Sequence, residues 1–587
     1  MKASWRNKVP VESRLDAITG LPAALAISVL VFAWPDISLA IRGVPGSYPI
    51  VTAIFTLAVV ALVVAWPRDS SHGPARASTE GPGPLVAAAT ASAAAAVVIV
   101  AAYRWMRLVV WYPYHADMLI VIREATQRFL SGHSPYTTYR SYDTTWNMAM
   151  PYGPVLWGSF VVPRLLRLDF RIVTTIGQLF VPAWCGVASA IEISRGRLAA
   201  AWSWLALSSA LVLAFDVQGF TLMGHTPVYW PLFPLFAVTI ERRRWIEAAC
   251  LLGILIAART TMVAMVPPFL MAVWTIGRRN VPAALTALAI TLTILFGPIV
   301  AWDAHAAWDS MVLSYGRVMK IAVWPALARP GIETIGVTEW LLEQHREWLV
   351  LPAQFAAMIA VYAASWVAIG RGRQPLPWMA LALFSFSMTT LWPVHYLYYD
   401  VLLLLVSGAL AATLDAGSTR ATLGAWALSL IVVCALVFIA LRAVASPFPH
   451  VAAGEASIDR PLRSGFAASE RDASRSFSWI VGRDATIVLP RSSAAAADIV
   501  LTARSPFDPA EPPQRMAAVL NGTLLKEIEI PGGWQDIRIA APRSAWWVGF
   551  NELRLAFSST VAPRDVGGGD DPRTLALAVS RVDLVTR

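Results

Sequence analysis

Four residues that could do chemistry lie near the ends of long apolar stretches: Asp117, Arg259, His225 and His395. Asp117 follows a hydrophobic stretch and precedes the helix-like run Met118–Leu130. A carboxylate at this place can act as a general base, removing the proton of an attacking hydroxyl while the bond to a donor breaks. Asp is also a common helix N-cap, so the alternative is that Asp117 only caps the run that follows it.

Arg259 ends a second apolar stretch, in the sequence Ala-Ala-Arg-Thr-Thr. A cation at membrane depth is costly unless it meets a partner, and a lipid phosphate is a suitable one. The alternative is that the side chain extends to the membrane interface without a ligand. His225 and His395 also lie near the ends of apolar stretches, where a lone histidine is more often a structural hydrogen-bonding residue.

Signatures of other chemistry are absent from the sequence, which has no HExxH, Walker, GxSxG or CxxC motif. Asp117 and Asp143 are too far apart to form a carboxylate motif, so we predict no metal site, and a divalent cation stays an unsupported option. We expect no cofactor. The cysteines all fall inside apolar segments, which predicts buried packing residues instead of a disulfide or a zinc site; they are Cys185, Cys250 and Cys434.

The elements that position these residues are predicted to be membrane helices. The chain has 587 residues, of which 57% are hydrophobic and 14% are charged, and one soluble core could not bury so much apolar surface. The formal charge is +10, but the basic residues form short clusters between hydrophobic segments, where they set membrane orientation. No basic face is interleaved with aromatic residues, so we expect no nucleic-acid partner.

We predict about 13 transmembrane helices from the lengths of the hydrophobic segments. Alternating them from a cytoplasmic N-terminus places the basic clusters between them on one side. Counting residues 153–168 as a further crossing would break this agreement, so that stretch is predicted to be a re-entrant or interfacial helix. The predicted crossings are 21–43, 48–66, 85–106, 172–193, 198–216, 227–240, 246–259, 262–277, 281–302, 348–370, 376–391, 395–414 and 421–446.

The composition changes after the last predicted crossing. Short alternating runs, separated by turn signals such as Asn521-Gly522, predict an all-β sandwich. Three of its tryptophans either line a sugar-stacking platform or pack in the core; they are Trp534, Trp546 and Trp547. We therefore expect an N-terminal two-helix extension with a cytoplasmic linker (1–84), a transmembrane module (85–446) and a sandwich outside the cytoplasm (447–587).

The order of these motifs resembles the first third of the GT-C glycosyltransferases. Asp117 precedes an amphipathic helix that ends in SGHSPY (Ser131–Tyr136), and MPYGPVLW (Met150–Trp157) follows. Within that superfamily, residues 85–415 are most similar to the polyprenol-phosphate-mannose-dependent mannosyltransferases of glycosyltransferase family 87. The sandwich resembles galactose-binding-like jelly-roll modules, which often hold glycans.

The resemblance implies inverting transfer of a sugar, mannose or another, from a polyprenyl-phosphate donor to an extracytoplasmic glycan or glycolipid acceptor. Asp117 matches the family's catalytic base, and Arg259, at the position of its lysine, would hold the lipid phosphate. The residues expected beside the phosphate or shaping the pocket are His395, Tyr396, Tyr136, Tyr152 and His225. Arginine in place of lysine and His225 in place of glutamine leave the donor sugar open. The expected location is a bacterial-type plasma (inner) membrane, crossed many times and in contact with its lipids.

Two other classes of function compete with this interpretation. A transporter or flippase for lipid-linked saccharides would favour paired ionisable residues near the bilayer midplane and internal repeats. The sequence shows neither, because its charges gather at helix ends. A scaffold protein of envelope assembly would keep a degenerate membrane module and use the sandwich as its working part.

Overall fold

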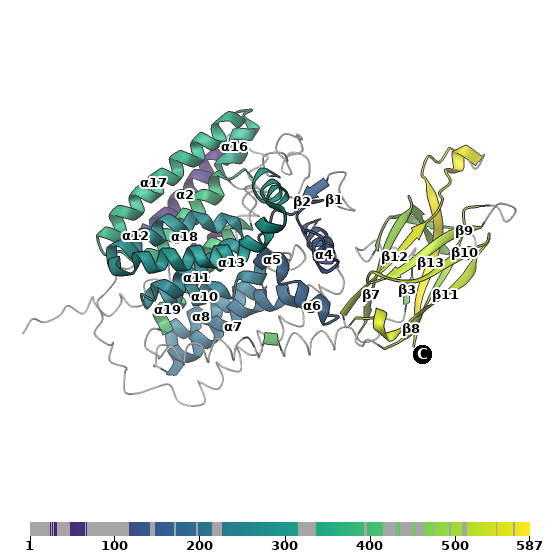
Figure 1. Cartoon of the computed structure of the whole chain (residues 1–587), viewed down its shortest axis with the longest axis horizontal. Coiled ribbons are helices and arrows are strands. Elements are labelled where there is room, and N and C mark those ends of the chain that lie inside the picture. The colour runs from purple at the N-terminus through teal and green to yellow at the C-terminus, as the bar shows by residue number, and fades with distance from the viewer. Residues whose placement is uncertain are drawn as a thin grey trace, which may run out of the picture.

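The computed structural model joins a mostly helical N-terminal region to a C-terminal region of antiparallel sheets (Figure 1). It describes residues 24, 26–27, 29–31, 47–64, 66, 117–140, 147–168, 172–194, 198–213, 226–314, 336–391, 396–414, 430, 433–434, 450–452, 463–472, 475–491, 495–507, 513–547, 549–566 and 570–586.

Apolar helices pack side by side in the N-terminal region. Three stretches of the described chain are long and apolar enough to cross a membrane: Ile172–Ile193, Arg278–Leu313 and Glu347–Gly370. The other predicted crossings stay predictions, and 85–106 lies outside the described residues. The helices are α2 (Ser47–Val64), α4 (Asp117–Leu130), α5 (Pro154–Gly158), α6 (Val161–Leu165), α7 (Ile172–Ser194), α8 (Leu198–Leu213), η3 (Thr226–Tyr229), α10 (Leu232–Glu241), α11 (Trp245–Ala258), η4 (Thr260–Met265), α12 (Val266–Ile276), η5 (Arg278–Asn280), α13 (Val281–Trp308), η6 (Asp309–Leu313), α16 (Val337–Glu343), η7 (Glu347–Leu349), α17 (Val350–Gly370), α18 (Pro375–Thr389) and α19 (Leu397–Leu414).

The loop that begins near Asp117 is folded into regular elements. Its predicted helix Met118–Leu130 is confirmed, because α4 spans Asp117–Leu130. A small hairpin of β1 (Thr138–Arg140) and β2 (Asn147–Ala149) follows it. Residues 153–168 contain only the five-residue helices α5 and α6. Neither is long enough to cross a bilayer, in agreement with the prediction that this stretch does not cross.

Helix α13 changes direction at Asp303, whose backbone is non-helical (φ −156°, ψ 86°). The Ala306 backbone N–H donates to the Asp303 carboxylate over 2.9 Å, so Asp303 caps a new run of helix. Helical backbone then continues through η6 to Leu313.

Two antiparallel sheets form the C-terminal region. The five-stranded sheet has the order β10-β9-β12-β7-β4, and the six-stranded sheet has the order β11-β8-β13-β6-β5 with β3 as a sixth strand beside β13. Alternate residues of both sheets meet in one core, as the predicted alternation requires. Asn521 and Gly522 turn β9 into β10 with φ of 51° and 82°, so the predicted Asn-Gly hairpin turn is confirmed. The strands are β3 (His450–Ala452), β4 (Arg463–Ser464), β5 (Phe466–Arg471), β6 (Ser476–Val481), β7 (Asp484–Arg491), β8 (Ala497–Arg504), β9 (Gln514–Leu520), β10 (Thr523–Ile530), β11 (Gln535–Ala541), β12 (Gly549–Phe557) and β13 (Leu575–Thr586).

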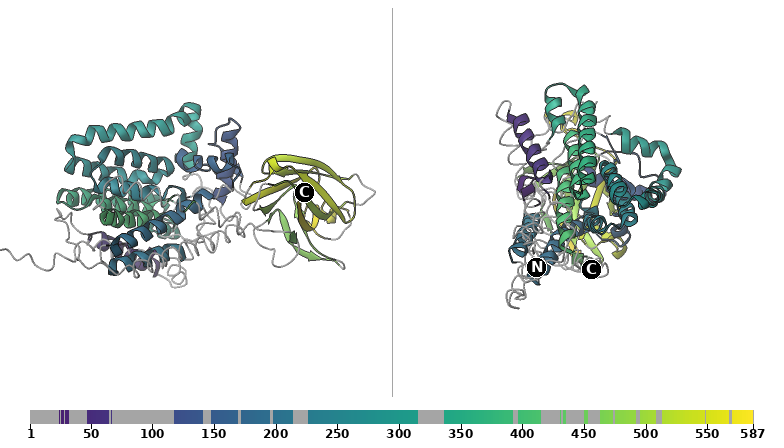
Figure 2. Two further views of the ribbon diagram at one scale, coloured as in Figure 1. Left: turned by 90° about the horizontal axis from the view of Figure 1, so that it is seen from below. Right: turned by 90° about the vertical axis from the view of Figure 1, so that its left-hand side faces the viewer.

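The five-stranded sheet contacts the helical region at α4 and α6. Arg123 of α4 forms an ion pair with Glu552 of β12. The guanidinium of Arg164, on α6, lies 5.6 Å from the ring centroid of Trp547. The sheets lie beside the α4 end of the helical region in two views of the molecule (Figures 1 and 2). The end of the sandwich at which β12 begins therefore packs on the helix that begins at Asp117.

Candidate functional site

A buried ion pair lies among the helices, between Arg259 and Asp400. Arg259 Nη1 donates to Asp400 Oδ2 over 3.2 Å and to the hydroxyl oxygen of Tyr229 over 3.0 Å. The Tyr229 hydroxyl donates to Asp400 Oδ2 over 2.8 Å, and Trp230 Nε1 donates to Oδ1 over 3.3 Å. The Tyr396 ring centroid lies 5.3 Å from the Arg259 guanidinium carbon. We call these five residues the Arg259 cluster.

Helix ends bring the two charges together. Arg259 directly follows α11, with extended backbone (φ −144°, ψ 117°), and Asp400 lies in the first turn of α19. A cation at a helix C-terminus and an anion at a helix N-terminus are each favoured by the partial charge of the helix end. Arg259 at the end of α11 and Asp400 at the start of α19 therefore stabilise their own helices as well as the ion pair.

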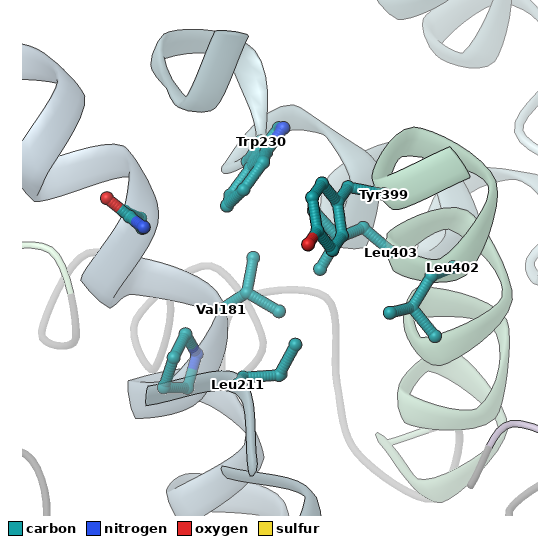
Figure 3. Close-up of a pocket in the computed structure, with 8 residues that line it drawn as sticks. Val181, Leu211, Trp230, Tyr399, Leu402 and Leu403 are labelled. Atoms are coloured by element: carbon teal, nitrogen blue, oxygen red, sulfur yellow. The ribbon is translucent and has the colours of Figure 1, made fainter. Parts of the chain in front are cut away.

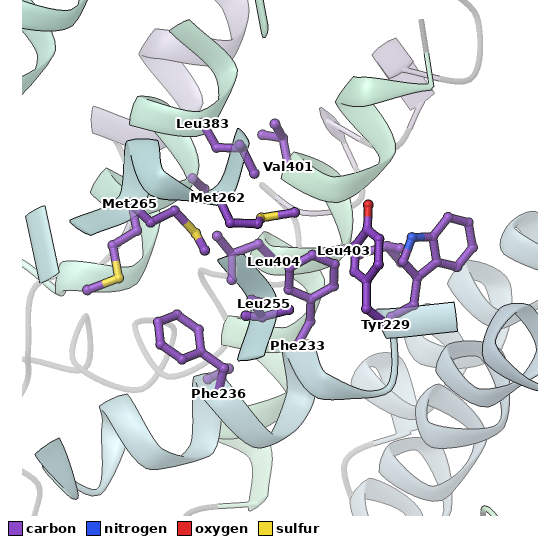
Figure 4. Close-up of a cluster of buried hydrophobic side chains, with 14 of the residues drawn as sticks. Tyr229, Phe233, Phe236, Leu255, Met262, Met265, Leu383, Val401, Leu403 and Leu404 are labelled. Carbon is purple, nitrogen blue, oxygen red and sulfur yellow. The ribbon is translucent and has the colours of Figure 1, made fainter. Parts of the chain in front are cut away.

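Apolar side chains pack against the Arg259 cluster. Tyr229 meets Phe233 edge to face, with ring centroids 6.0 Å apart. Figure 4 shows Tyr229 and Phe233 beside Leu403 and Leu404 of α19 in the cluster of buried hydrophobic residues. A low-dielectric surrounding strengthens the ion pair and raises the cost of leaving either charge unpaired.

Arg259 has hydrogen-bonding capacity that the cluster leaves unused. Both of its hydrogen bonds come from Nη1. Within the described part of the chain, Nε and Nη2 donate to no residue. The guanidinium carries five N–H donors in a planar fork that suits phosphate oxygens. Asp400 and Tyr229 thus hold Arg259 in place without occupying its whole binding edge.

The turn that contains Tyr136 and Tyr152 is buried and hydrogen-bonded. The Tyr136 hydroxyl donates to the Tyr152 carbonyl over 3.0 Å and accepts from Trp157 Nε1 over 3.1 Å. Burial raises the pKa of Tyr136 above its ordinary value, so the hydroxyl stays protonated. These bonds fasten the segment after α4 to the start of α5.

This turn also packs against the chain next to Arg259. A Cβ built on Gly153 would lie 2.1 Å from the carbonyl oxygen of Ala257, a distance that no side chain tolerates. Glycine at this position therefore lets the backbone before α5 approach the last turn of α11. A Cβ on Gly177 of α7 would likewise lie 2.0 Å from the Pro227 carbonyl oxygen of η3, which carries Tyr229.

The structure brings some of the sequence-predicted residues together. Tyr396 stacks on Arg259, and the turn of Tyr152 abuts the end of α11. Asp117 is the first residue of α4, so it lies on the same folded loop, but its side chain is outside the described set. His225 and His395 also lie outside the described residues, immediately before Thr226 of η3 and Tyr396 respectively.

Sequence reasoning missed Asp400, Tyr229 and Trp230. Asp400 lies inside the predicted crossing 395–414 and is the single ionisable residue of α19 besides its two tyrosines. An acid in an apolar helix is costly and predicts a buried partner. That signal could have linked Asp400 to a cation, although it could not have singled out Arg259.

A small apolar pocket lies next to the Arg259 cluster (Figure 3). Trp230, whose indole nitrogen donates to Asp400, lies beside Tyr399, and Val181 and Leu211 lie across from them. The lining comes from α7, α8 and α19 together with Trp230: Gln178, Val181, Pro182, Leu211, Trp230, Tyr399, Leu402 and Leu403.

Trp534, Trp546 and Trp547 of the sandwich do not form one platform. Trp546 is fully buried in the core between the sheets, where Arg491 covers its ring at 4.4 Å. Trp547 faces Arg164 of the helical region. Trp534 packs with Phe477 in a separate cluster. The platform interpretation of the trio is therefore wrong, because Trp546 is buried between the sheets and Trp534 and Trp547 contact different groups of residues.

No group of three or more His, Cys, Asp or Glu side chains in the described ranges is placed to hold a metal ion.

Comparison with known proteins gives little further information. No protein-family model and no curated protein matches this chain. One solved structure is similar over part of it, described as "Structure of a family 35 carbohydrate binding module from an environmental isolate". The two are 16% identical, the match covers 21% of this chain and 88% of that chain, and the TM-score is 0.15. A similarity of this size gives no basis for assigning a function.

Proposed function

We propose that this protein is a membrane glycosyltransferase that moves a sugar from a polyprenyl-phosphate donor to a glycan or glycolipid acceptor outside the cytoplasm. The Arg259 cluster is the observation that carries the proposal. It is a cation held at a helix end by a buried acid and a tyrosine, with N–H donors left over. The finer assignment, to an enzyme like those of the GT-C superfamily, rests on the sequence motifs.

The Arg259 cluster suits a lipid phosphate by its hydrogen-bond donors and by its surroundings. Asp400 offsets the charge of Arg259, so a bound phosphate would be held by the N–H groups of Nε and Nη2 and not by a net positive charge. Apolar helices surround the cluster, which fits the hydrocarbon chain of a lipid donor. Because the Tyr396 ring covers one face of the Arg259 guanidinium, a phosphate would bind at the edge of the guanidinium, where its N–H groups point.

In the proposed reaction, Asp117 accepts the proton of an acceptor hydroxyl. The hydroxyl oxygen forms a bond to the anomeric carbon as the bond from that carbon to the phosphate oxygen breaks. The electron pair of the breaking bond goes to the phosphate, whose added charge Arg259 stabilises through Nε and Nη2. Attack opposite the leaving phosphate inverts the anomeric configuration. The close contact of Gly153 with Ala257 supports this pairing of the Asp117 loop with Arg259.

Replacing the proposed base is the direct test. Asp117→Asn keeps the size of the side chain but cannot take the proton, so we expect transfer to fall at least about 100-fold. Transfer would be measured in membranes supplied with polyprenyl-phosphate sugar, with insertion checked by the amount of protein extracted. Asp143→Asn, in the same loop, serves as the matched control and should retain activity. Wild-type turnover by Asp117→Asn would refute the proposal.

A transporter of lipid-linked saccharides is the second candidate. The pairing of Arg259 with Asp400 favours it, because buried pairs of ionisable residues are common on transport pathways. Both residues, however, lie within a turn of a helix end, where the transferase proposal requires them. Reconstituted protein that moves labelled donor across vesicles without forming a glycosidic bond would favour the transporter.

A further inference from the structure

The outer face of the six-stranded sheet carries a compact group of aromatic rings and arginines, separate from the core between the sheets. Ile480 of β6 and Ala503 of β8 point into that core. Because side chains alternate along a strand, Trp479 and Arg504 point to the opposite face. We call this group the outer-face cluster; its members are Arg475, Phe477, Trp479, Arg504 and Trp534.

Arg504 lies among three rings. Its guanidinium carbon is 5.1 Å from the ring centroid of Phe477, 5.4 Å from that of Trp479 and 5.1 Å from that of Trp534. Arg475 lies 4.9 Å from the ring of Trp534. Each distance is within cation–π range, so the rings fix where the two guanidinium groups lie. Trp534 contacts both cations.

The two cations of this cluster lack an anionic partner within the part of the chain that the structure describes. The Nε atoms of Arg475 and Arg504 are both buried and without a hydrogen-bond acceptor there. Other arginines of the same sheet region are paired: Arg538 with Asp498, Arg573 with Glu470 and Asp571, and Arg581 with Asp583. Arg475 and Arg504 both contact Trp534, and two positive charges so close together repel each other unless an anion binds between them.

We infer that the outer-face cluster binds a saccharide that carries an oxyanion, a carboxylate or a phosphate. The guanidinium groups of Arg475 and Arg504 would donate N–H groups to the oxyanion, as planar forks do to carboxylates and phosphates. Trp534 is only half-buried, whereas Phe477 and Trp479 are 4% and 9% exposed. The accessible indole of Trp534 is therefore the surface on which the sugar ring would pack.

This site is independent of the proposed transfer reaction. It lies on the sheet opposite to the one whose Glu552 contacts α4. A long glycan acceptor is one molecule that could reach it, but binding there requires neither Asp117 nor Arg259. Loss of transfer and loss of glycan binding are thus separate outcomes.

Three trisaccharides that differ in charge test the inference. The purified full chain in detergent would be titrated calorimetrically with a neutral glucose trimer, a glucuronate trimer and a mannose trimer that ends in a 6-phosphate. We expect at least about tenfold tighter binding of one charged probe than of the neutral one, which corresponds to about 1.4 kcal/mol. The glucuronate and phosphate arms identify the oxyanion. Equal affinity for all three, or no binding of any, would overturn the inference.

Two variants connect binding to the cluster. Arg475→Gln and Arg504→Gln should each weaken binding of the charged probe at least about tenfold, because each removes a charged fork. Arg515→Gln, on the other sheet and paired with Glu529, is the matched control and should bind as the wild type does. Because Arg504 contacts three rings, its replacement can destabilise the sandwich, so the melting temperature of the Arg504→Gln protein is measured as well. Arg475 contacts one ring, so Arg475→Gln tests the site with less effect on packing. Wild-type affinity in a folded Arg475→Gln protein would contradict the inference.

Discussion

Arg259 and Asp400 depend on each other for their burial. Asp400→Asn keeps an acceptor oxygen for only one of Tyr229 and Trp230, and it leaves the Arg259 charge without its counter-ion. Removing one partner of a buried pair costs about 3–5 kcal/mol, so we expect a clear loss of stability. The measurement is the melting temperature of the purified protein in detergent.

A double variant separates the structural role of this pair from its proposed role in catalysis. Arg259→Met with Asp400→Leu removes both charges, and apolar pairs of similar volume often restore the stability that a single change loses. We expect the double variant to melt near the wild type and still to lack transfer. If it regained transfer together with stability, Arg259 would be a structural residue and not a phosphate ligand.

A local signal singled out Arg259 as a candidate, because it ends an apolar run. Its partner could not be predicted, because any acid near a helix end would satisfy the same local rule and the choice of Asp400 depends on how α11 and α19 pack. Trp534 and Trp546 show the same limit: composition placed both in the sandwich, but sheet pairing decides which one is buried.

Among the elements, the contact between the start of α5 and the end of α11 is the tightest link between the Asp117 loop and the Arg259 cluster. Gly153→Ala would place a methyl group 2.1 Å from the Ala257 carbonyl oxygen, so the two segments must separate. Overpacking of this kind costs about 1–3 kcal/mol. We expect a lower melting temperature and, on the proposed function, weaker transfer because Tyr152 moves away from Arg259.

Gly158→Ala is the matched control for this contact. Gly158 ends the same helix, α5, and a Cβ there meets nothing within 4 Å. Alanine is a better helix former than glycine, so we expect equal or slightly higher stability. Equal melting temperatures for Gly153→Ala and Gly158→Ala would show that α5 and α11 do not pack as described.

Elements were predictable where periodicity and length were strong. The amphipathic run after Asp117 gave α4, and the alternating runs and the Asn521-Gly522 turn gave the sheets. The two short helices α5 and α6 could not be told from one interfacial helix, because Pro163 and the break after Gly158 leave the apolar pattern intact. The approach of Gly153 to Ala257 joins segments about 100 residues apart, which no local pattern reports.

At the scale of the whole molecule, the sandwich packs on the helix that begins at Asp117. The ion pair of Arg123 with Glu552 is largely buried, with 13% and 15% of the two side chains exposed. Arg164 reaches Trp547 beside it and also donates to Gln127 of α4. The contact therefore joins α4, α6 and the five-stranded sheet, and it could hold α4 in one orientation.

A charge reversal tests whether the sandwich restrains α4. Glu552→Arg sets a like charge against Arg123, and buried like charges repel strongly. We expect faster hydrogen exchange of the backbone amides of 118–130 in the full chain, measured by mass spectrometry, because α4 loses its partner. Combining Arg123→Glu with Glu552→Arg restores opposite charges and should restore protection. Glu529→Arg, at an exposed pair on the same sheet, is the control that should leave α4 unchanged. Unaltered exchange of α4 in Glu552→Arg would mean that the two regions are not coupled and that the sandwich does not position the proposed base.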